Sequence, residues 1–138
     1  MNITKQYTAL CMILTVTHVY AHQEHTSPQI IQQIKDTALL AAAGTDDLSL
    51  VTQLIKQGAN TNFETVDGMN PLRAASLNGN RHVMKILFRR GAKPQSALVA
   101  FEYIMRTMAG THHAERAEKA YTLLSGEYQR FLSHKEHH

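Results

Sequence analysis

A helix–turn–helix pattern between residues 67 and 94 constrains the fold of this chain most strongly. Asn70 followed by Pro71 is a typical helix start, because the asparagine side chain caps free N–H groups and proline lacks one that would stay unpaired. Gly79 ends this short helix. Apolar residues then recur at helical spacing until Gly91, which suits a left-handed C-cap. The sequence therefore predicts two short antiparallel helices, too small to bury their own apolar faces.

The same pattern occurs once more, earlier in the chain. An offset of 33 residues pairs small, apolar and glycine positions: Leu39 with Leu72, Ala41 with Ala74, Ala42 with Ala75, Leu54 with Leu87, Gly58 with Gly91, and Ala59 with Ala92. These matches fall at helix-packing and helix-ending positions. Units repeated at a fixed period bury a continuous core by stacking on one another.

The segment resembles an ankyrin repeat. The residues that carry the resemblance are Asp67, Gly68, Asn70, Pro71, Leu72, Ala75, Gly79, Val83, Ile86, Leu87, Gly91 and Ala92. Asn70 stands where the family has Thr and keeps a capping side chain, whereas Arg73 stands where it has His. The resemblance implies an all-α fold, an α-solenoid of about three stacked helix pairs with one β-hairpin finger. It also implies a binding scaffold rather than an enzyme.

The two ends of the chain set the expected domain boundaries. Residues 1–21 combine Lys5 with a short apolar stretch, which predicts a signal peptide cut after Ala21 and a periplasmic or secreted protein; a buried N-terminal helix is the alternative. Residues 22–27 are expected to be flexible and 133–138 to form a disordered tail. The ankyrin domain is expected at 28–132, with repeats at about 36–66, 67–95 and 96–126, the last a divergent capping repeat.

A first helix is expected to begin at Ser27-Pro28 and to place three isoleucines, Ile30, Ile31 and Ile34, on one face. That face is predicted to seal the open end of the stack, because a terminal unit separates the core from water. The sequence leaves open whether this helix fuses with the next one.

The third pair is expected to contain a helix from Ser96 to about Ala109 and a partner from Ala114 to Leu124. A further turn after Gly126 is predicted to pack its aromatic residues on this pair.

The sequence predicts no catalytic residues, no cofactor and no metal site. Glycine-rich phosphate loops, nucleophile elbows and zinc helices are missing from it. Glu115 and Glu118 share a helix face but lie among basic residues, which indicates a solvated surface. The histidines leave metal binding as an alternative, although they fall at chain ends and in a turn; they are His22, His25, His112, His113, His134, His137 and His138.

Six basic residues gather around the second repeat: Arg73, Arg81, Lys85, Arg89, Arg90 and Lys93. The whole chain has a formal charge of only +3, and nucleic-acid binding would need a broader basic stripe, so none is expected. An acidic protein partner is one interpretation of the cluster, and a solvated helix face is the other.

The resemblance places a partner-binding surface on the finger and the inner helices, at Glu64, Val66, Asp67, Met69, Arg73, Leu77 and Asn78. Phe63 is expected to be buried, and Val66 and Met69 exposed. The predicted function is an exported, monomeric protein-binding module of inhibitor or immunity type, acting on an exported enzyme or toxin such as a secreted hydrolase. A secreted effector that binds a host protein is the alternative. Neither a cofactor nor membrane attachment after cleavage is expected.

Overall fold

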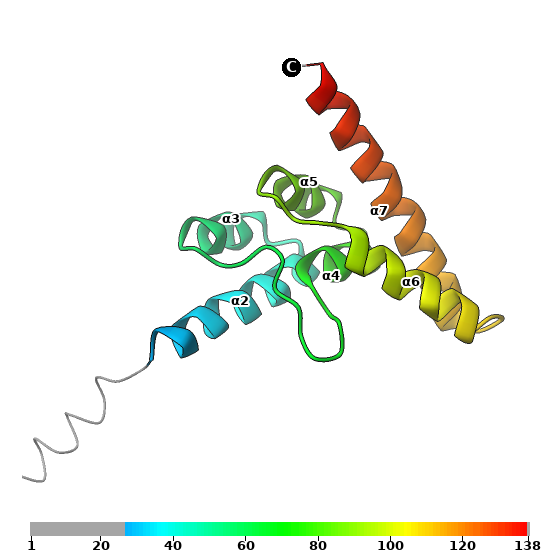
Figure 1. Cartoon of the computed structure of the whole chain (residues 1–138), viewed down its shortest axis with the longest axis horizontal. Helices are drawn as coiled ribbons and strands as arrows, with labels where there is room; N and C mark the ends of the chain where they lie inside the picture. Colours follow the sequence, from blue (N-terminus) through cyan, green and yellow to red (C-terminus); the bar gives the residue numbers. More distant parts are fainter. Residues whose placement is uncertain (1–26, 138) are drawn as a thin grey trace, which may run out of the picture. The chain divides into compact units, whose positions relative to one another are not determined.

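The computed structural model describes residues 27–137. That part of the chain forms six helices (Figure 1), which are α2 (Pro28–Thr45), α3 (Leu48–Lys56), α4 (Pro71–Leu77), α5 (Arg81–Arg89), α6 (Gln95–Thr107) and α7 (His112–Glu136). The chain divides into residues 1–31 and 32–138, and the helices belong to the second unit apart from the start of α2. The predicted all-α class is confirmed. The signal peptide expected at 1–21 and the flexible segment expected at 22–27 lie outside the described residues, apart from Ser27.

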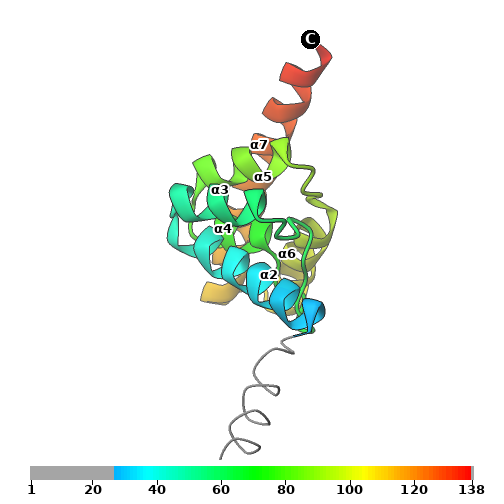
Figure 2. The same ribbon diagram turned by 90° about the vertical axis from the view of Figure 1, so that its left-hand side faces the viewer.

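Along the chain the helices follow one another as three consecutive pairs, α2 and α3, α4 and α5, and α6 and α7, each joined by a short connection. Helix α3 contacts α5 across neighbouring pairs, and α7 contacts α4, α5 and α6. Figure 2 shows α3 and α5 beside each other on one side of the described helices. Positions related by the 33-residue offset are buried in both copies: Leu39 and Leu72, Ala42 and Ala75, Leu54 and Leu87, and Ala59 and Ala92. The repeat register predicted from the sequence therefore describes the packing.

The residues predicted to begin and end the helices do so in the structure. Asn70 accepts a hydrogen bond from the Arg73 N–H at 2.8 Å, and Pro71 occupies the first helical position. Gly58 and Gly91 have φ angles of 87° and 85°, which glycine adopts at little steric cost.

Equivalent backbone groups after α3 and α5 are satisfied by different side chains. Asn62 accepts a hydrogen bond from the Lys93 N–H (2.8 Å) and donates one to the Gly91 carbonyl (3.1 Å). One repeat earlier, the corresponding groups are the Asn60 N–H and the Gly58 carbonyl. Asp36 accepts from the first of these at 2.7 Å, and Gln32 donates to the second at 2.9 Å. Two side chains of α2 thus make, with the loop after α3, the hydrogen bonds that Asn62 makes with the loop after α5.

The expected role of the isoleucines in α2 is wrong. Ile34 is 60% exposed, and Ile30 and Ile31 are exposed as well. The α2 side chains that reach the loop after α3 are polar: besides Gln32 and Asp36, Lys35 donates to the Gln57 carbonyl at 3.0 Å. Unpaired backbone groups at the end of α3 need hydrogen-bonding partners, so a polar face covers them. The structure also settles the open question of fusion, since α2 is one helix of 18 residues.

Helix α7 is longer than predicted. Its 25 residues run through Gly126 and Ser133, so the expected break near Gly126 and the expected disordered tail from residue 133 are both wrong up to Glu136. A buried stripe continues across the glycine at Ala117, Ala120, Leu124 and Glu127. Tertiary packing of such a stripe outweighs the small helix penalty of one glycine.

Among the described residues, none of the helices combines the length and apolar character needed to cross a bilayer.

Candidate functional site

The loop between α3 and α4, residues 59–69, is the finger, and it projects from the helices in Figure 1. Its outer turn is closed by two backbone hydrogen bonds, from the Thr65 N–H to the Met69 carbonyl and from the Gly68 N–H to the Thr65 carbonyl, both 2.9 Å. Residues 27–137 contain no strand, so the finger is built from turns and the expected β-hairpin is not present there. The Thr65 hydroxyl also accepts from the Met69 N–H at 3.0 Å.

Arg73 supports the finger from the first turn of α4. Its guanidinium Nη1 donates to the carbonyl of Gly68 at 3.0 Å and to that of Asp67 at 3.4 Å. Arg73 stands where the ankyrin pattern has histidine, and it ties the finger to the helix below. Its role in the structure is therefore to hold the loop in place.

The Asp67 carboxyl group stabilises the same turn. A hydrogen bond from the Thr65 hydroxyl is the main cause that lowers the pKa of Asp67, followed by a backbone hydrogen bond and the positive charge of Arg73. Asp67 is therefore ionised at neutral pH and places a negative charge at the tip of the finger.

Glu64 connects the finger to the third helix pair. Its Oε2 accepts from the Ser96 hydroxyl at 2.5 Å, in the first turn of α6, and from the Asn70 side-chain amide at 3.4 Å. Asn70 is buried. Sequence reasoning missed Ser96 as a finger contact, because residues 64 and 96 are brought together only by stacking of the repeats.

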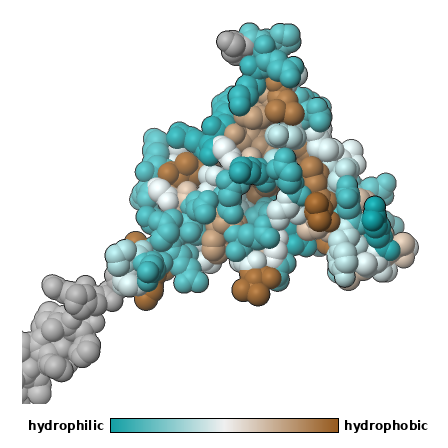
Figure 3. All heavy atoms as spheres, in the orientation of Figure 1, coloured by the Kyte–Doolittle hydropathy of each residue, from teal (hydrophilic) through white to brown (hydrophobic). Residues whose placement is uncertain are grey.

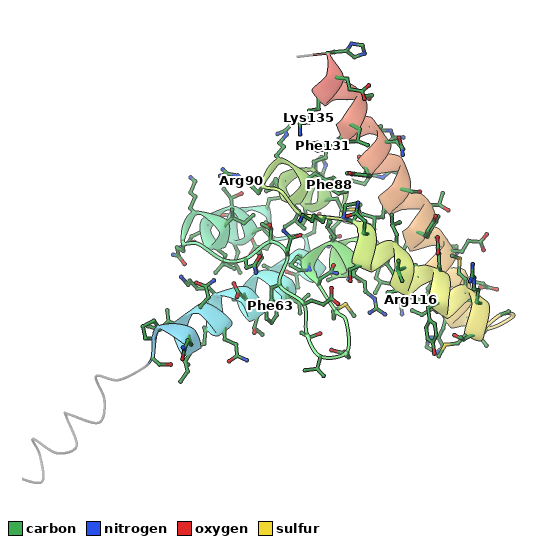
Figure 4. The ribbon with its side chains drawn as sticks, viewed as in Figure 1. Phe63, Phe88, Arg90, Arg116, Phe131 and Lys135 are labelled. Atoms are coloured by element: carbon green, nitrogen blue, oxygen red, sulfur yellow. The ribbon has the colours of Figure 1, made fainter. Side chains whose placement is uncertain are left out.

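Val66 is fully exposed at the tip of the finger. Hydrophobic surface shows at the end of this loop in Figure 3, next to hydrophilic residues. Phe63 and Met69, expected to be buried and exposed respectively, are both half-buried. Figure 4 shows Phe63 at the base of the finger. Of these three apolar residues, only Val66 has its whole side chain free for contact with another molecule.

The remaining two predicted site residues lie at the end of α4. Leu77 is half-buried and packs against the core, whereas Asn78 is exposed and donates its side-chain amide to the Ala74 carbonyl at 3.0 Å. The seven predicted residues therefore divide by exposure. Glu64, Val66, Asp67 and Asn78 are exposed to solvent, whereas Met69, Arg73 and Leu77 are half-buried. Arg73 supports the finger, and Leu77 packs against the core.

The chain matches the family model for ankyrin repeats in three copies over residues 5–97. The chain belongs to the ankyrin repeat family. The match begins inside residues 1–21, the segment expected to be a signal peptide, and export remains a prediction. Among curated proteins, this ankyrin chain is similar to a human protein described as mitochondrial disaggregase, with 37% identity over 60 residues. That similarity covers 44% of this chain and 8% of the human protein.

Membership of the ankyrin family makes this chain a protein–protein interaction module. Within residues 27–137, no three His, Cys, Asp or Glu side chains come together as metal ligands would. Glu115 lies 3.7 Å from the ring of His112, and both side chains are well exposed.

Proposed function

We propose that this ankyrin protein is exported, binds one partner protein through the tip of its finger, and acts by occlusion as an inhibitor or immunity-type protein. The observation that carries the proposal is the fully exposed Val66 side chain on a hydrogen-bonded loop. An apolar group on an ordered loop loses little conformational entropy on binding, so its burial contributes more fully to affinity.

Val66 has charged and polar neighbours on the same loop. Asp67 is ionised beside it, and Glu64 is exposed two residues before it. Such neighbours orient a partner and disfavour wrong ones. Blocking an enzyme or toxin by occlusion requires only a binding surface and no catalytic groups on this chain. An exported enzyme or toxin is therefore the proposed partner.

Export is tested first. The full chain, expressed in a Gram-negative host with its own N-terminus and a C-terminal affinity tag, is expected in the periplasmic fraction. N-terminal sequencing of the purified protein is expected to begin at His22. A product that keeps Met1 and stays in the cytoplasm would contradict export without bearing on the finger.

The finger is tested with a matched pair of substitutions. The tagged protein is used to isolate its partner from periplasmic extract, and the purified partner is then titrated for binding and for loss of its own activity. We expect Val66→Asp to weaken binding at least about tenfold, as removal of a central apolar contact does. Leu50→Asp is the control, because Leu50 is 39% exposed on α3, away from the finger.

Circular dichroism should show wild-type helix content for both variants. Equal affinity of the Val66→Asp variant and the wild type would refute the finger as the docking site. Partner binding that leaves the partner's activity unchanged would refute occlusion. Turnover of a substrate by the purified chain itself would refute the interpretation as a binding module.

A further inference from the structure

A second surface lies between α5 and the C-terminal half of α7, apart from the finger. A hollow of about 520 Å³ opens there, and its lining comes from these two helices: Lys85, Arg89, Glu127, Arg130, Phe131, His134 and Lys135. We call it the basic groove. The proposed function does not use it, and only the continuation of α7 past Gly126 creates it.

The apolar part of the lining of the basic groove is Phe131, and an aromatic cluster holds this ring in place. The Phe131 ring stacks on Phe88 with centroids 5.6 Å apart, and Tyr128 lies 5.4 Å from the same Phe88 ring. Phe88 is buried in the core, whereas Phe131 is half-buried. Figure 4 shows Phe88, Phe131 and Lys135 close to one another where α5 meets α7. Phe131 therefore presents part of its ring to the groove from a fixed position.

The rim of the basic groove carries an excess of positive charge. Four of its seven residues are Lys or Arg, one is His134, and its single acid is Glu127. The Glu127 side chain is 1% exposed, and its Oε1 already lies 2.6 Å from Arg130 and 3.4 Å from Arg81. Between residues 27 and 137, no carboxylate lies within ion-pair distance of Lys85, Arg89 or Lys135.

Helix electrostatics accounts for only part of this arrangement. Arg89 and Lys135 lie in the last turns of α5 and α7, where cations interact favourably with free carbonyl groups. Lys85 and Arg130 lie inside their helices and gain nothing from that effect. Lys85 and Arg89 are also four residues apart on one helix face, which is unfavourable for like charges. An anion in the groove would relieve this repulsion.

We propose that the basic groove docks an acidic segment of a partner protein. Carboxylates of that segment pair with Lys85, Arg89 and Lys135, and one of its apolar side chains lies on Phe131. The combination of one apolar ring and a cationic rim favours a peptide over nucleic acid, because a phosphate backbone follows a longer basic track. It also favours a peptide over a lipid surface, since Phe131 is half-buried and does not project for insertion.

The test uses the full chain and defined probes. A rhodamine-labelled 14-residue amphipathic peptide with four Glu and two Leu at helical spacing is titrated by fluorescence anisotropy. Two matched peptides replace the four Glu by Gln or the two Leu by Ser. We expect the Gln peptide to bind at least about tenfold more weakly and the Ser peptide to lose affinity as well. Raising the salt from 50 to 300 mM should weaken binding of the acidic peptide, because the rim charges are exposed.

Substitutions on exposed groove residues avoid the risk of unfolding. The double variant Lys85→Glu, Arg89→Glu is expected to bind the acidic peptide at least about tenfold more weakly than the wild type. The double variant Lys85→Gln, Lys135→Gln is expected to bind it severalfold more weakly. Arg106→Glu on α6 and Arg116→Glu on α7 are the controls, because both residues are exposed and outside the groove. Figure 4 shows Arg116 at the opposite end of α7. Both controls should stay within twofold of the wild type.

The finger variant Val66→Asp should leave peptide binding unchanged, which separates this test from that of the proposed function. Equal binding of the acidic and Gln peptides would overturn the proposal, as would equal losses in the groove and control variants. Tighter binding of a 12-residue oligothymidine than of the acidic peptide would assign the groove to nucleic acid instead. A dimer seen by light scattering and dissociated by the Lys85→Glu, Arg89→Glu pair would make a second copy the occupant.

Discussion

Single polar side chains hold neighbouring repeats in register. Asn62 bonds both the carbonyl of Gly91 and the N–H of Lys93, and Asn80 donates to the Ala43 carbonyl at 2.8 Å while being buried itself. Each bond joins groups about 30 residues or more apart. Such contacts fix the offset between helix pairs more precisely than apolar packing does, because hydrogen bonds are directional.

Asn62→Ala tests this role at the residue scale. The substitution removes both hydrogen bonds to the loop after α5, so we expect the free energy of unfolding to fall by about 1–3 kcal/mol. Urea titration followed by circular dichroism measures the loss. Asn78→Ala is the control, because the Asn78 amide makes one local bond to Ala74. A loss no larger than that of the control would show that residue 62 does not couple the repeats.

Helix α7 illustrates what a single element adds to the repeat pattern. At 1.5 Å per residue its 25 residues extend about 37 Å. Its first half covers α6 and α4, and its second half packs along α5 through Glu127, Tyr128 and Phe131. Glu127 occupies a position in the buried stripe that an apolar residue would normally fill. Arg81 and Arg130 pair with its Oε1 from the solvent side, whereas its buried Oε2 has no hydrogen-bond partner among residues 27–137.

Glu127→Ala tests how α7 is held on α5. The change removes both ion pairs and leaves a gap between the two helices, so we expect about 1–3 kcal/mol of destabilisation. Hydrogen exchange followed by mass spectrometry should show faster exchange in residues 128–136 than in the first half of α7. Glu118→Ala, an exposed position on the same helix, should change neither quantity. Unchanged protection of residues 128–136 would show that the aromatic contacts alone anchor this half.

At the scale of the whole molecule, the repeats share one core. Its buried side chains come from all three helix pairs, including Leu39 and Leu54 of the first pair, Leu72 and Leu87 of the second, and Phe101 of the third. A unit of two short helices cannot bury enough apolar surface alone, so stability depends on the contacts between units. Loss of one central side chain should therefore affect every pair.

Leu87→Ala tests this cooperativity. Leu87 is fully buried in the outer helix of the middle pair, and the cavity should cost about 2–5 kcal/mol, a large part of the total stability of a small domain. Thermal unfolding by circular dichroism should show a much lower midpoint or a chain unfolded at room temperature. Val99→Ala is the control, since Val99 is 64% exposed. A sharp transition at the wild-type midpoint would contradict the packing described here.

The sequence by itself determined the local features of this protein. Caps and turns depend on residues within one helical turn, which is why the sequence alone predicts the roles of Asn70, Pro71, Gly58 and Gly91. The 33-residue offset also related positions that are buried in both copies, such as Leu39 with Leu72 and Leu54 with Leu87, because these equivalent residues meet equivalent neighbours. For the candidate site, the exposure of Val66 followed from the ankyrin pattern, which places that residue near a loop tip.

Only the tertiary structure decided which faces are covered by distant segments. In the structure Ile34 is exposed and Glu127 is buried. Helix α7 continues beyond Gly126, and Glu64 accepts a hydrogen bond from Ser96. Each of these outcomes depends on contacts between residues far apart in the chain, and local spacing carries no information about such contacts. The basic groove has the same origin: α5 and α7 bring its charges together across more than 40 positions, because packing of Phe131 on Phe88 places the two helices side by side.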